Sequence, residues 1–366
     1  MLLLKWKVGG VLKRIKQLFY LDNIGCGYLY FYIHFINEVA CFYFLGNIIG
    51  NQTYLWIVAL LYDILAFLPQ GIIGYICDKH KKINIDFIGI SCLCIALLIL
   101  GLNLKIKYLS LIILCIGNAF IHVSGAEKTI RCSSGKLSHS AIYVAGGSFG
   151  IIVGKILASL KIPFWIIILI VLTTIPFILL ARTYKENNNF QNINYHNNKL
   201  PKYSCICLII IVIIVRGYMG YGIPTTWNKT TIDAILLYCF MGLGKAFGGI
   251  FADRYGVKKI AMLSTIISLP LLILGNNYMF LSLIGIMIFS MNMSITLYLI
   301  ISVLNKTPGL AFGLTTIGLF FGTLPIFFVQ IKNVIINSLI IGVLTIISLI
   351  ILKITIREEN KLWMIF

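Results

Sequence analysis

The chain has 366 residues, of which 60% are hydrophobic and only 11% charged, and its mean hydropathy is +0.98. A soluble domain of this length carries about 25% charged residues, so the composition excludes a cytosolic enzyme. The net charge of +19 lies in short basic clusters between apolar runs. This pattern argues against nucleic acid as a partner and is typical of a membrane protein facing anionic lipid.

In residues 1–20, apolar side chains recur at helical spacing opposite a set of lysines and an arginine. The pattern predicts an amphipathic helix lying on the membrane surface. A secretory signal peptide is disfavoured because lysines interrupt the apolar run and no small-residue cleavage site follows it.

Twelve runs are long and apolar enough to cross a bilayer, which takes about twenty mostly apolar residues. They cover 24–45, 53–77, 83–103, 106–131, 138–158, 161–181, 203–223, 231–252, 260–275, 278–304, 308–330 and 332–352. An Asn-rich stretch at 182–202 separates the sixth run from the seventh, and its low apolar content predicts a flexible linker that packs no core. We therefore expect an all-α membrane protein with six-helix halves at 21–181 and 203–352 and a tail at 353–366.

The basic residues predict the orientation of these helices. With both termini in the cytoplasm, the cytoplasmic segments hold 22 Lys and Arg residues and the outer loops hold five. Because basic residues concentrate on the cytoplasmic side of membrane proteins, both termini and the linker are expected there. A multi-pass protein of the plasma or inner membrane follows from this pattern.

The ten cysteines indicate no metal site. Cys92/Cys94 and Cys205/Cys207 lie inside apolar runs with C-x-C spacing, whereas zinc and disulfide sites favour C-x-x-C spacing and polar flanks. We interpret them as buried thiols. The nucleotide-binding motif G-x-x-x-x-G-K-[ST] does not occur in the sequence either. No cofactor, metal or nucleotide is therefore expected.

A short motif is repeated at the inner end of the second helix of each half, 175 residues apart and each time followed by a pair of lysines. Its residues are Gly74, Asp78 and Lys79 in the first copy and Gly249, Asp253, Arg254 and Gly256 in the second. The glycine allows close approach of a neighbouring helix. The carboxylate can accept hydrogen bonds from the N-terminus of a facing helix. These properties predict a gate; the alternative is a set of ordinary loop charges that obey the positive-inside rule.

The motif resembles the loop signature of the major facilitator superfamily, G-x-x-x-D-R-x-G-[RK]-[RK]. The second copy matches it in full, and the first lacks the second glycine and is one residue shorter. The resemblance covers essentially the whole chain, and it implies a fold in which the first, fourth, seventh and tenth helices line a central cavity. The segments 117–122 (GNAFIH) and 145–150 (AGGSFG) also resemble the fosmidomycin-resistance-like branch of that superfamily.

Polar side chains inside the spans are costly in a bilayer and are therefore candidate functional residues. The candidates for a substrate and proton pathway are His34, Glu38, Asp63, Asn118, His122, Arg216 and Asn292. All except Asp63 lie on the four helices that the resemblance places around the cavity. Structural interpretations stay open: His122 as a hydrogen-bonded histidine of the helix packing, and the two asparagines as links between helices.

Glu38 and Arg216 lie about two-thirds of the way across the first helix of each half. We expect them to face each other as a metastable ion pair, because each alone is an expensive buried charge. Protonation of Glu38, or an anionic substrate at Arg216, would release the partner. His34, one helical turn away, is placed to relay a proton, and Asp63 is a second candidate proton carrier. A static structural ion pair is the alternative.

These features predict a secondary active transporter that moves a small molecule by alternating access and is not an enzyme. Proton coupling is the default expectation, export is slightly favoured, and we expect a monomer in the lipid bilayer. The alternatives are an uptake symporter and a receptor or scaffold that uses the same fold without transport.

Overall fold

The computed structural model describes residues 24–49, 55–80, 84–103, 106–186, 188–222, 227, 230–329, 331 and 333–357. The surface helix expected over 1–20 and the tail beyond residue 357 lie outside these ranges. The described residues form helices and one isolated antiparallel bridge, between His196 and Ile356, and no strand. The expected all-α class is confirmed.

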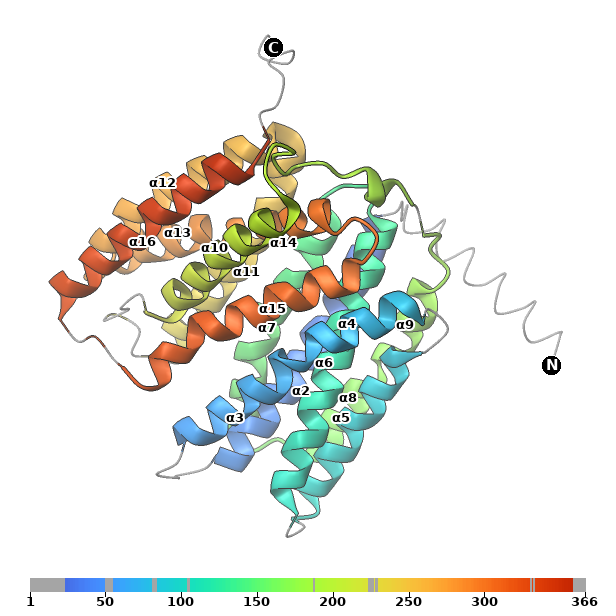
Figure 1. The fold of residues 1–366 in the computed structure, drawn as a ribbon. Helices are drawn as coiled ribbons and strands as arrows, with labels where there is room; N and C mark the ends of the chain where they lie inside the picture. The colour runs from blue at the N-terminus through green and yellow to red at the C-terminus, as the bar shows by residue number, and fades with distance from the viewer. Residues whose placement is uncertain are drawn as a thin grey trace.

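Figure 1 shows two helical bundles lying side by side and joined by one connection. The first bundle contains α2 (Ile24–Ile49), α3 (Leu55–Phe67), α4 (Pro69–Lys79), α5 (Ile85–Gly101), α6 (Lys107–Cys132), α7 (Ser138–Ser159), α8 (Phe164–Leu172) and α9 (Thr174–Ala181). The second contains α10 (Lys202–Gly222), α11 (Thr231–Tyr255), α12 (Val257–Leu274), α13 (Met279–Ser290), α14 (Asn292–Val303), α15 (Pro308–Thr323), η2 (Leu324–Phe327) and α16 (Val334–Thr355).

Within the described residues, eleven helical segments are long and apolar enough to span a membrane, and α5 is a twelfth, shorter apolar helix. Three spans are each built from two α-helices, namely α3 with α4, α8 with α9, and α13 with α14, and a fourth joins α15 to the 3-10 helix η2. The first of these interruptions lies at Leu68, which precedes Pro69, and proline cannot donate the backbone hydrogen bond that a continuous helix needs. The twelve segments match the runs expected from the sequence.

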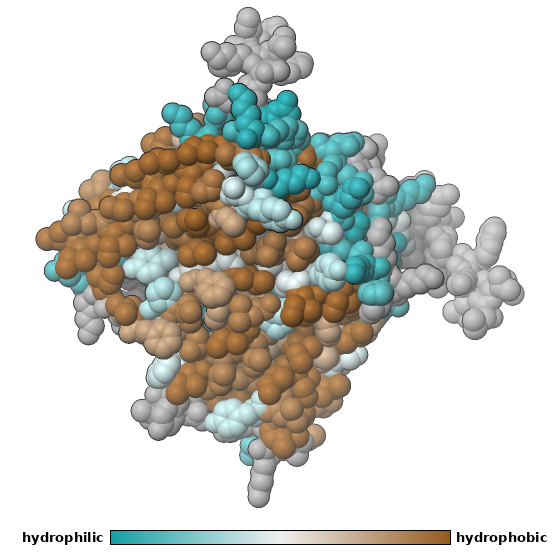
Figure 2. Space-filling model, viewed as in Figure 1, coloured by the Kyte–Doolittle hydropathy of each residue, from teal (hydrophilic) through white to brown (hydrophobic). Residues whose placement is uncertain are grey.

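The outer surface of the bundles is suited to lipid. Large side chains such as Ile335 (72% exposed) and Leu339 (65% exposed) project from α16, and Figure 2 shows hydrophobic residues over most of the visible face. Hydrophilic residues gather at the end where the connection between the bundles lies, which we call the linker end. The chain is thus a multi-pass integral membrane protein.

Glycines bring the helices into close contact both within the first bundle and across the two bundles. A Cβ added at Gly146, Gly150 or Gly154 of α7 would overlap backbone carbonyl oxygens of α2. Across the bundles, a Cβ at Gly74 of α4 would overlap the backbone at Gly309 of α15. Only glycine permits backbones to approach this closely at these positions.

The linker is docked on the protein, and the expectation that it packs no core is wrong. Its 3-10 helix Asn188–Asn192 (η1) places Phe190 in the interior, 1% exposed, with the guanidinium of Arg131 5.5 Å from its ring centroid. Asn305 donates a hydrogen bond to the Gln191 carbonyl, and the Asn197 amide donates to the Thr355 carbonyl. The buried side chains of Tyr184 (4% exposed), Phe190 and Ile193 (6% exposed), together with hydrogen bonds to the backbone, anchor this segment despite its polar composition.

Candidate functional site

The aspartates of the repeated motif join the two bundles at the linker end. Asp78 of α4 accepts hydrogen bonds from the backbone amides of Gly309 (3.2 Å) and Leu310 (2.9 Å), at the start of α15. Asp253 of α11 accepts from the amides of Leu137 (2.8 Å) and Ser138 (2.9 Å), at the start of α7. Each carboxylate therefore binds the N-terminus of a helix in the opposite half, where the helix dipole favours an anion. We call these contacts the Asp78 lock and the Asp253 lock.

The two locks differ in their surroundings. In the Asp78 lock, Arg131 of α6 also donates to the aspartate (3.1 Å) and to Glu127 (2.7 Å), and the side chains of Asp78 and Arg131 are buried. Lys79 and Arg254 are exposed, and their charged groups lie over the rings of neighbouring tyrosines instead of joining the locks. Sequence reasoning missed Arg131, although its place on the fourth span beside the motif was a usable signal.

Gly256, the last candidate of the motif, has a specific backbone role. Its φ of 94° lies in the region that side chains other than glycine rarely adopt. The residue ends α11 and precedes α12 without a longer connection. The full motif copy therefore needs this glycine for the turn between its two helices.

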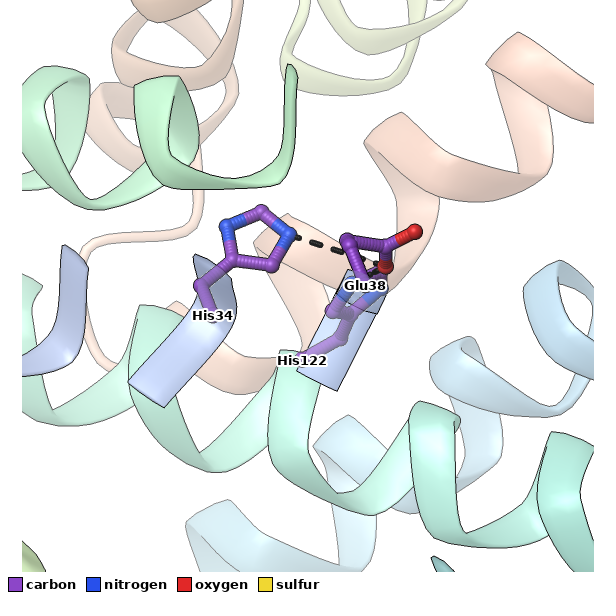
Figure 3. Close-up of side chains that lie close together, drawn as sticks. All are labelled: His34, Glu38 and His122. Atoms are coloured by element: carbon purple, nitrogen blue, oxygen red, sulfur yellow. Dashed lines mark hydrogen bonds and ion pairs between the residues drawn. The ribbon is translucent and has the colours of Figure 1, made fainter. Parts of the chain in front are cut away.

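A second site lies inside the first bundle, where Glu38, His34 and His122 meet (Figure 3). We call these three residues the central cluster. His122 Nε2 lies 2.8 Å from Glu38 Oε1, and His34 Nε2 lies 3.9 Å from the same oxygen. All three side chains are less than a tenth exposed. Helices α2 and α6 thus hold two imidazoles around one carboxylate.

The hydrogen bonds around the cluster define where its protons lie. Gln70 Nε2 is 2.8 Å from the Ala66 carbonyl oxygen, which only a donor can approach, and 3.2 Å from His122 Nδ1. His122 Nδ1 therefore accepts from Gln70, and Nε2–H donates to Glu38. His34 Nδ1 is 2.9 Å from the Tyr143 carbonyl oxygen and must carry its hydrogen. In a neutral ring, His34 Nε2 then turns a lone pair toward the Glu38 carboxylate.

This pattern suits a proton better than a metal ion. The ligand atoms of the three residues lie within 4.8 Å of one another, the one such grouping in the described part of the chain. Metal binding needs a lone pair on His122 Nε2, and Gln70 opposes that tautomer by placing a donor at Nδ1. A lone pair that faces a carboxylate, as at His34 and Glu38, is repelled by it, and this repulsion is removed when one proton is added to either group. The arrangement can therefore take up a proton.

A polar network holds the carboxylate in place. Asn37 donates to Glu38 Oε1 (3.3 Å) and to Asn118 Oδ1, and Asn118 donates to the Tyr62 hydroxyl (2.9 Å). The network links α2, α6 and α3, so Asn118 acts as a link between helices beside the cluster. Sequence reasoning did not single out Asn37, Gln70 or Tyr62, although an amide next to proline in an apolar run, as at Gln70, was visible.

The expected pairing of Glu38 with Arg216 is wrong. Arg216 of α10 donates to the Thr296 hydroxyl (2.9 Å), and the ion pairs of Glu38 are with the two histidines. Similar depth in the membrane does not fix the distance between side chains across a cavity, and the histidines compete for the carboxylate at shorter range. Lys245 of α11 interacts electrostatically with both Glu38 and Arg216.

Two further candidates have different surroundings. Asp63 is half-buried on α3, where its charge interacts with that of Glu38 and its side chain lies beside Thr323. Asn292 points to α12, where its amide donates to the hydroxyls of Ser264 (2.9 Å) and Thr265 (3.0 Å). Because α12 belongs to the same half, Asn292 links two helices within the second bundle. This agrees with the structural interpretation that the sequence left open, and a place for Asn292 in a substrate and proton pathway stays a prediction.

Comparison with solved structures identifies the fold. The chain is similar to a variant of FucP, the E. coli fucose:proton symporter, with a TM-score of 0.62 and 14% identity over 93% of this chain and 100% of that chain. FucP in the outward conformation matches with a TM-score of 0.61 and 16% identity over 91% and 99% of the two chains. The human organic anion transporter MFSD10 (TETRAN) matches with a TM-score of 0.62 and 9% identity over 91% and 100%.

No protein-family model matches the chain, and no curated protein matches its sequence. The structural similarity at these identities shows the fold, which is that of transporters of the major facilitator superfamily. The resemblance seen in the repeated motif is therefore supported at the level of the fold. The resemblance to the fosmidomycin-resistance-like branch stays a prediction.

Proposed function

We propose that this protein is a secondary active transporter that moves a small solute by alternating access and is coupled to protons through Glu38 and His34. The observation that carries the proposal is the buried carboxylate of Glu38, which faces a histidine lone pair next to the interface between halves. The fold supports transport as the general activity, and FucP is a proton symporter with a similar fold.

The conformational part of the proposal rests on the contacts between halves. At the linker end, two carboxylates each bind two backbone amides of the opposite half. At the other end, the contacts between halves include a ring contact of exposed residues, Trp56 and Phe328, with centroids 6.3 Å apart. The two locks must break for the protein to open at the linker end.

The coupling part of the proposal rests on the groups whose charges interact with that of Glu38. They are His34 and Cys41 of α2, Tyr62 and Asp63 of α3, His122 of α6, Tyr143 of α7 and Lys245 of α11. Lys245 belongs to the opposite half, so its attraction to Glu38 depends on whether the carboxylate is ionised. Protonation of Glu38 removes this attraction between halves and biases the equilibrium between the two access states. In this proposal Asp63 is a second carboxylate, and its negative charge repels that of Glu38.

The test is accumulation of a panel of small solutes in proteoliposomes that contain the purified protein, with and without an imposed pH gradient. At least one solute is expected to accumulate only with the gradient, and Glu38→Gln is expected to abolish the response to the gradient. The exposed acid Glu186 at the linker end provides the control, Glu186→Gln. An absence of gradient-driven accumulation above that of empty vesicles, or a normal gradient response in Glu38→Gln, contradicts the proposal.

The orientation, with both termini in the cytoplasm, and the preference for export belong to the same proposal. The orientation rests on the excess of basic residues in the segments at the linker end. The preference for export rests on the resemblance of segments 117–122 and 145–150 to the fosmidomycin-resistance-like branch. Protease protection of a C-terminal tag in sealed vesicles tests the orientation, and the direction of the effective gradient in the vesicles tests the direction of transport.

A further inference from the structure

Lys245 is a cation at the interface between halves. On α11, Tyr238, Gly242, Lys245 and Gly249 share one face, because residues three and four apart are neighbours on a helix. This face packs on α7: a Cβ at Gly249 would overlap Ala141, and one at Gly242 would lie 2.6 Å from the Phe149 ring. Lys245 is half-buried on this face, and its charge interacts with those of Glu38 and Arg216.

Arg216 is the second cation at this place. Its residue is 7% exposed, and its Nη1 donates to the hydroxyl of Thr296, which in turn donates to the Asn292 carbonyl (2.9 Å). This contact fixes one nitrogen of a guanidinium that has five N–H donors. Within the part of the chain that the structure describes, neither Arg216 nor Lys245 forms an ion pair with an acidic side chain.

Neither cation has an acidic side chain of its own as an ion-pair partner in the described part of the chain. Arg216 and Lys245 repel each other, and the acid that interacts with Lys245 is Glu38, which already accepts hydrogen bonds from His122 and Asn37. The charge of Asp63 interacts with that of Glu38. Two cations in the interior of a membrane protein call for compensation.

We infer that Arg216 and Lys245 together form the binding site for a small organic carboxylate, a monoanion that enters between the two halves. The inference rests on the proposed transport function and names the chemical class of its solute. The planar fork of arginine matches a carboxylate with two parallel hydrogen bonds, and lysine adds a point charge. The ring of Phe149 on α7 lies against Gly242, which is one helical turn from Lys245 on α11. It also contacts Phe31, with ring centroids 5.9 Å apart. These half-buried rings offer an apolar surface to the body of the ligand.

The test compares benzoate with its neutral analogue benzamide in thermal unfolding of the purified full-length protein in detergent, at fixed pH and 0.3 M NaCl. A ligand that binds the native state raises the midpoint of unfolding. Benzoate is expected to raise it in a saturable manner, and benzamide at the same concentration is expected to give a much smaller shift. Lys245→Met and Arg216→Gln are expected to weaken the apparent affinity for benzoate at least tenfold.

Lys155→Met is the matched control, because Lys155 is another lysine between the halves but donates to the Tyr238 hydroxyl at 3.0 Å. Arg216→Lys keeps the charge if Arg216→Gln does not fold, and loss of the fork is still expected to weaken binding. Equal shifts with benzoate and benzamide, or a benzoate response that survives in both Lys245→Met and an Arg216 variant, overturn the inference. Saturable benzoate binding without solute accumulation in vesicles keeps the anion site and rejects transport. Proton-driven accumulation without carboxylate binding keeps transport and rejects the anion site.

Discussion

Replacing the lock aspartates should open the linker end, and the expected size follows from the contacts they make. In Asp253→Asn, two charge-assisted hydrogen bonds to the amides of Leu137 and Ser138 are lost, and the new amide group restores at most one neutral bond. A hydrogen bond to a charged group contributes about 1.5–3 kcal/mol, and the charge at a helix N-terminus contributes about 0.3–1 kcal/mol more. The partial exposure of the site favours the lower values. We expect the closed state to lose about 2 kcal/mol, which is roughly a 30-fold change in the opening equilibrium.

Hydrogen exchange measured by mass spectrometry checks this prediction directly, because the amides that the carboxylates bind are themselves reporters. Exchange at Leu137 and Ser138 should rise about 30-fold in Asp253→Asn, and exchange at Gly309 and Leu310 should rise in Asp78→Asn. Arg254→Gln removes a charge from the same motif without touching a lock and serves as the control. Unchanged exchange at these amides in both aspartate variants would refute the account of the locks.

Three further predictions concern the packing of helices and the linker. Gly150→Leu should destabilise the protein by at least about 1–3 kcal/mol, because a Cβ there overlaps the α2 backbone, whereas Gly342→Leu, with open space around it, should be close to neutral in thermal unfolding. Asn292→Ala should lower stability by about 1 kcal/mol without changing the response of transport to a pH gradient. Burial, and to a smaller extent the nearby Lys202 and Arg357, lower the pKa of His196. The unfolded state therefore binds more protons than the folded state, and docking of the linker should weaken as the pH falls below about 6.5. Amide hydrogen exchange in residues 190–200, corrected for intrinsic rates, should then become faster in the parent protein but not in His196→Gln.

The fold was predictable because its signals are local. Runs of apolar residues give the spans, as in α16, and the repeated motif specifies both a glycine for close approach and an acid at a helix end. The partners of Asp78 and Asp253 followed from the same chemistry, because the unpaired amides at a helix N-terminus attract a carboxylate wherever the chain brings them together.

The partners of the buried charges were not predictable in the same way. Glu38 lies near enough to Lys245 to interact with it, but its hydrogen bonds are with His122 and Asn37. The choice depends on differences of a few ångströms that are set by the rotation of each helix about its axis. The same reason explains Asn292, whose helix turns it toward α12. Docking of the linker depends on a few buried side chains, those of Tyr184, Phe190 and Ile193, which composition averaged over the segment conceals.

The central claim is that protonation of Glu38 controls which end of the molecule is open. Distances between spin labels at exposed sites measure the opening of both ends together. One pair, at residues 79 and 306, spans the two halves at the linker end, and the other, at residues 56 and 328, spans them at the opposite end. The labels can be attached to unnatural amino acids, which leaves the ten cysteines in place. Lowering the pH should lengthen the distances at one end and shorten those at the other. Glu38→Gln should show the low-pH distributions at every pH. Distributions that do not change with pH, or that change equally in Glu38→Gln and in the parent protein, would contradict the claim.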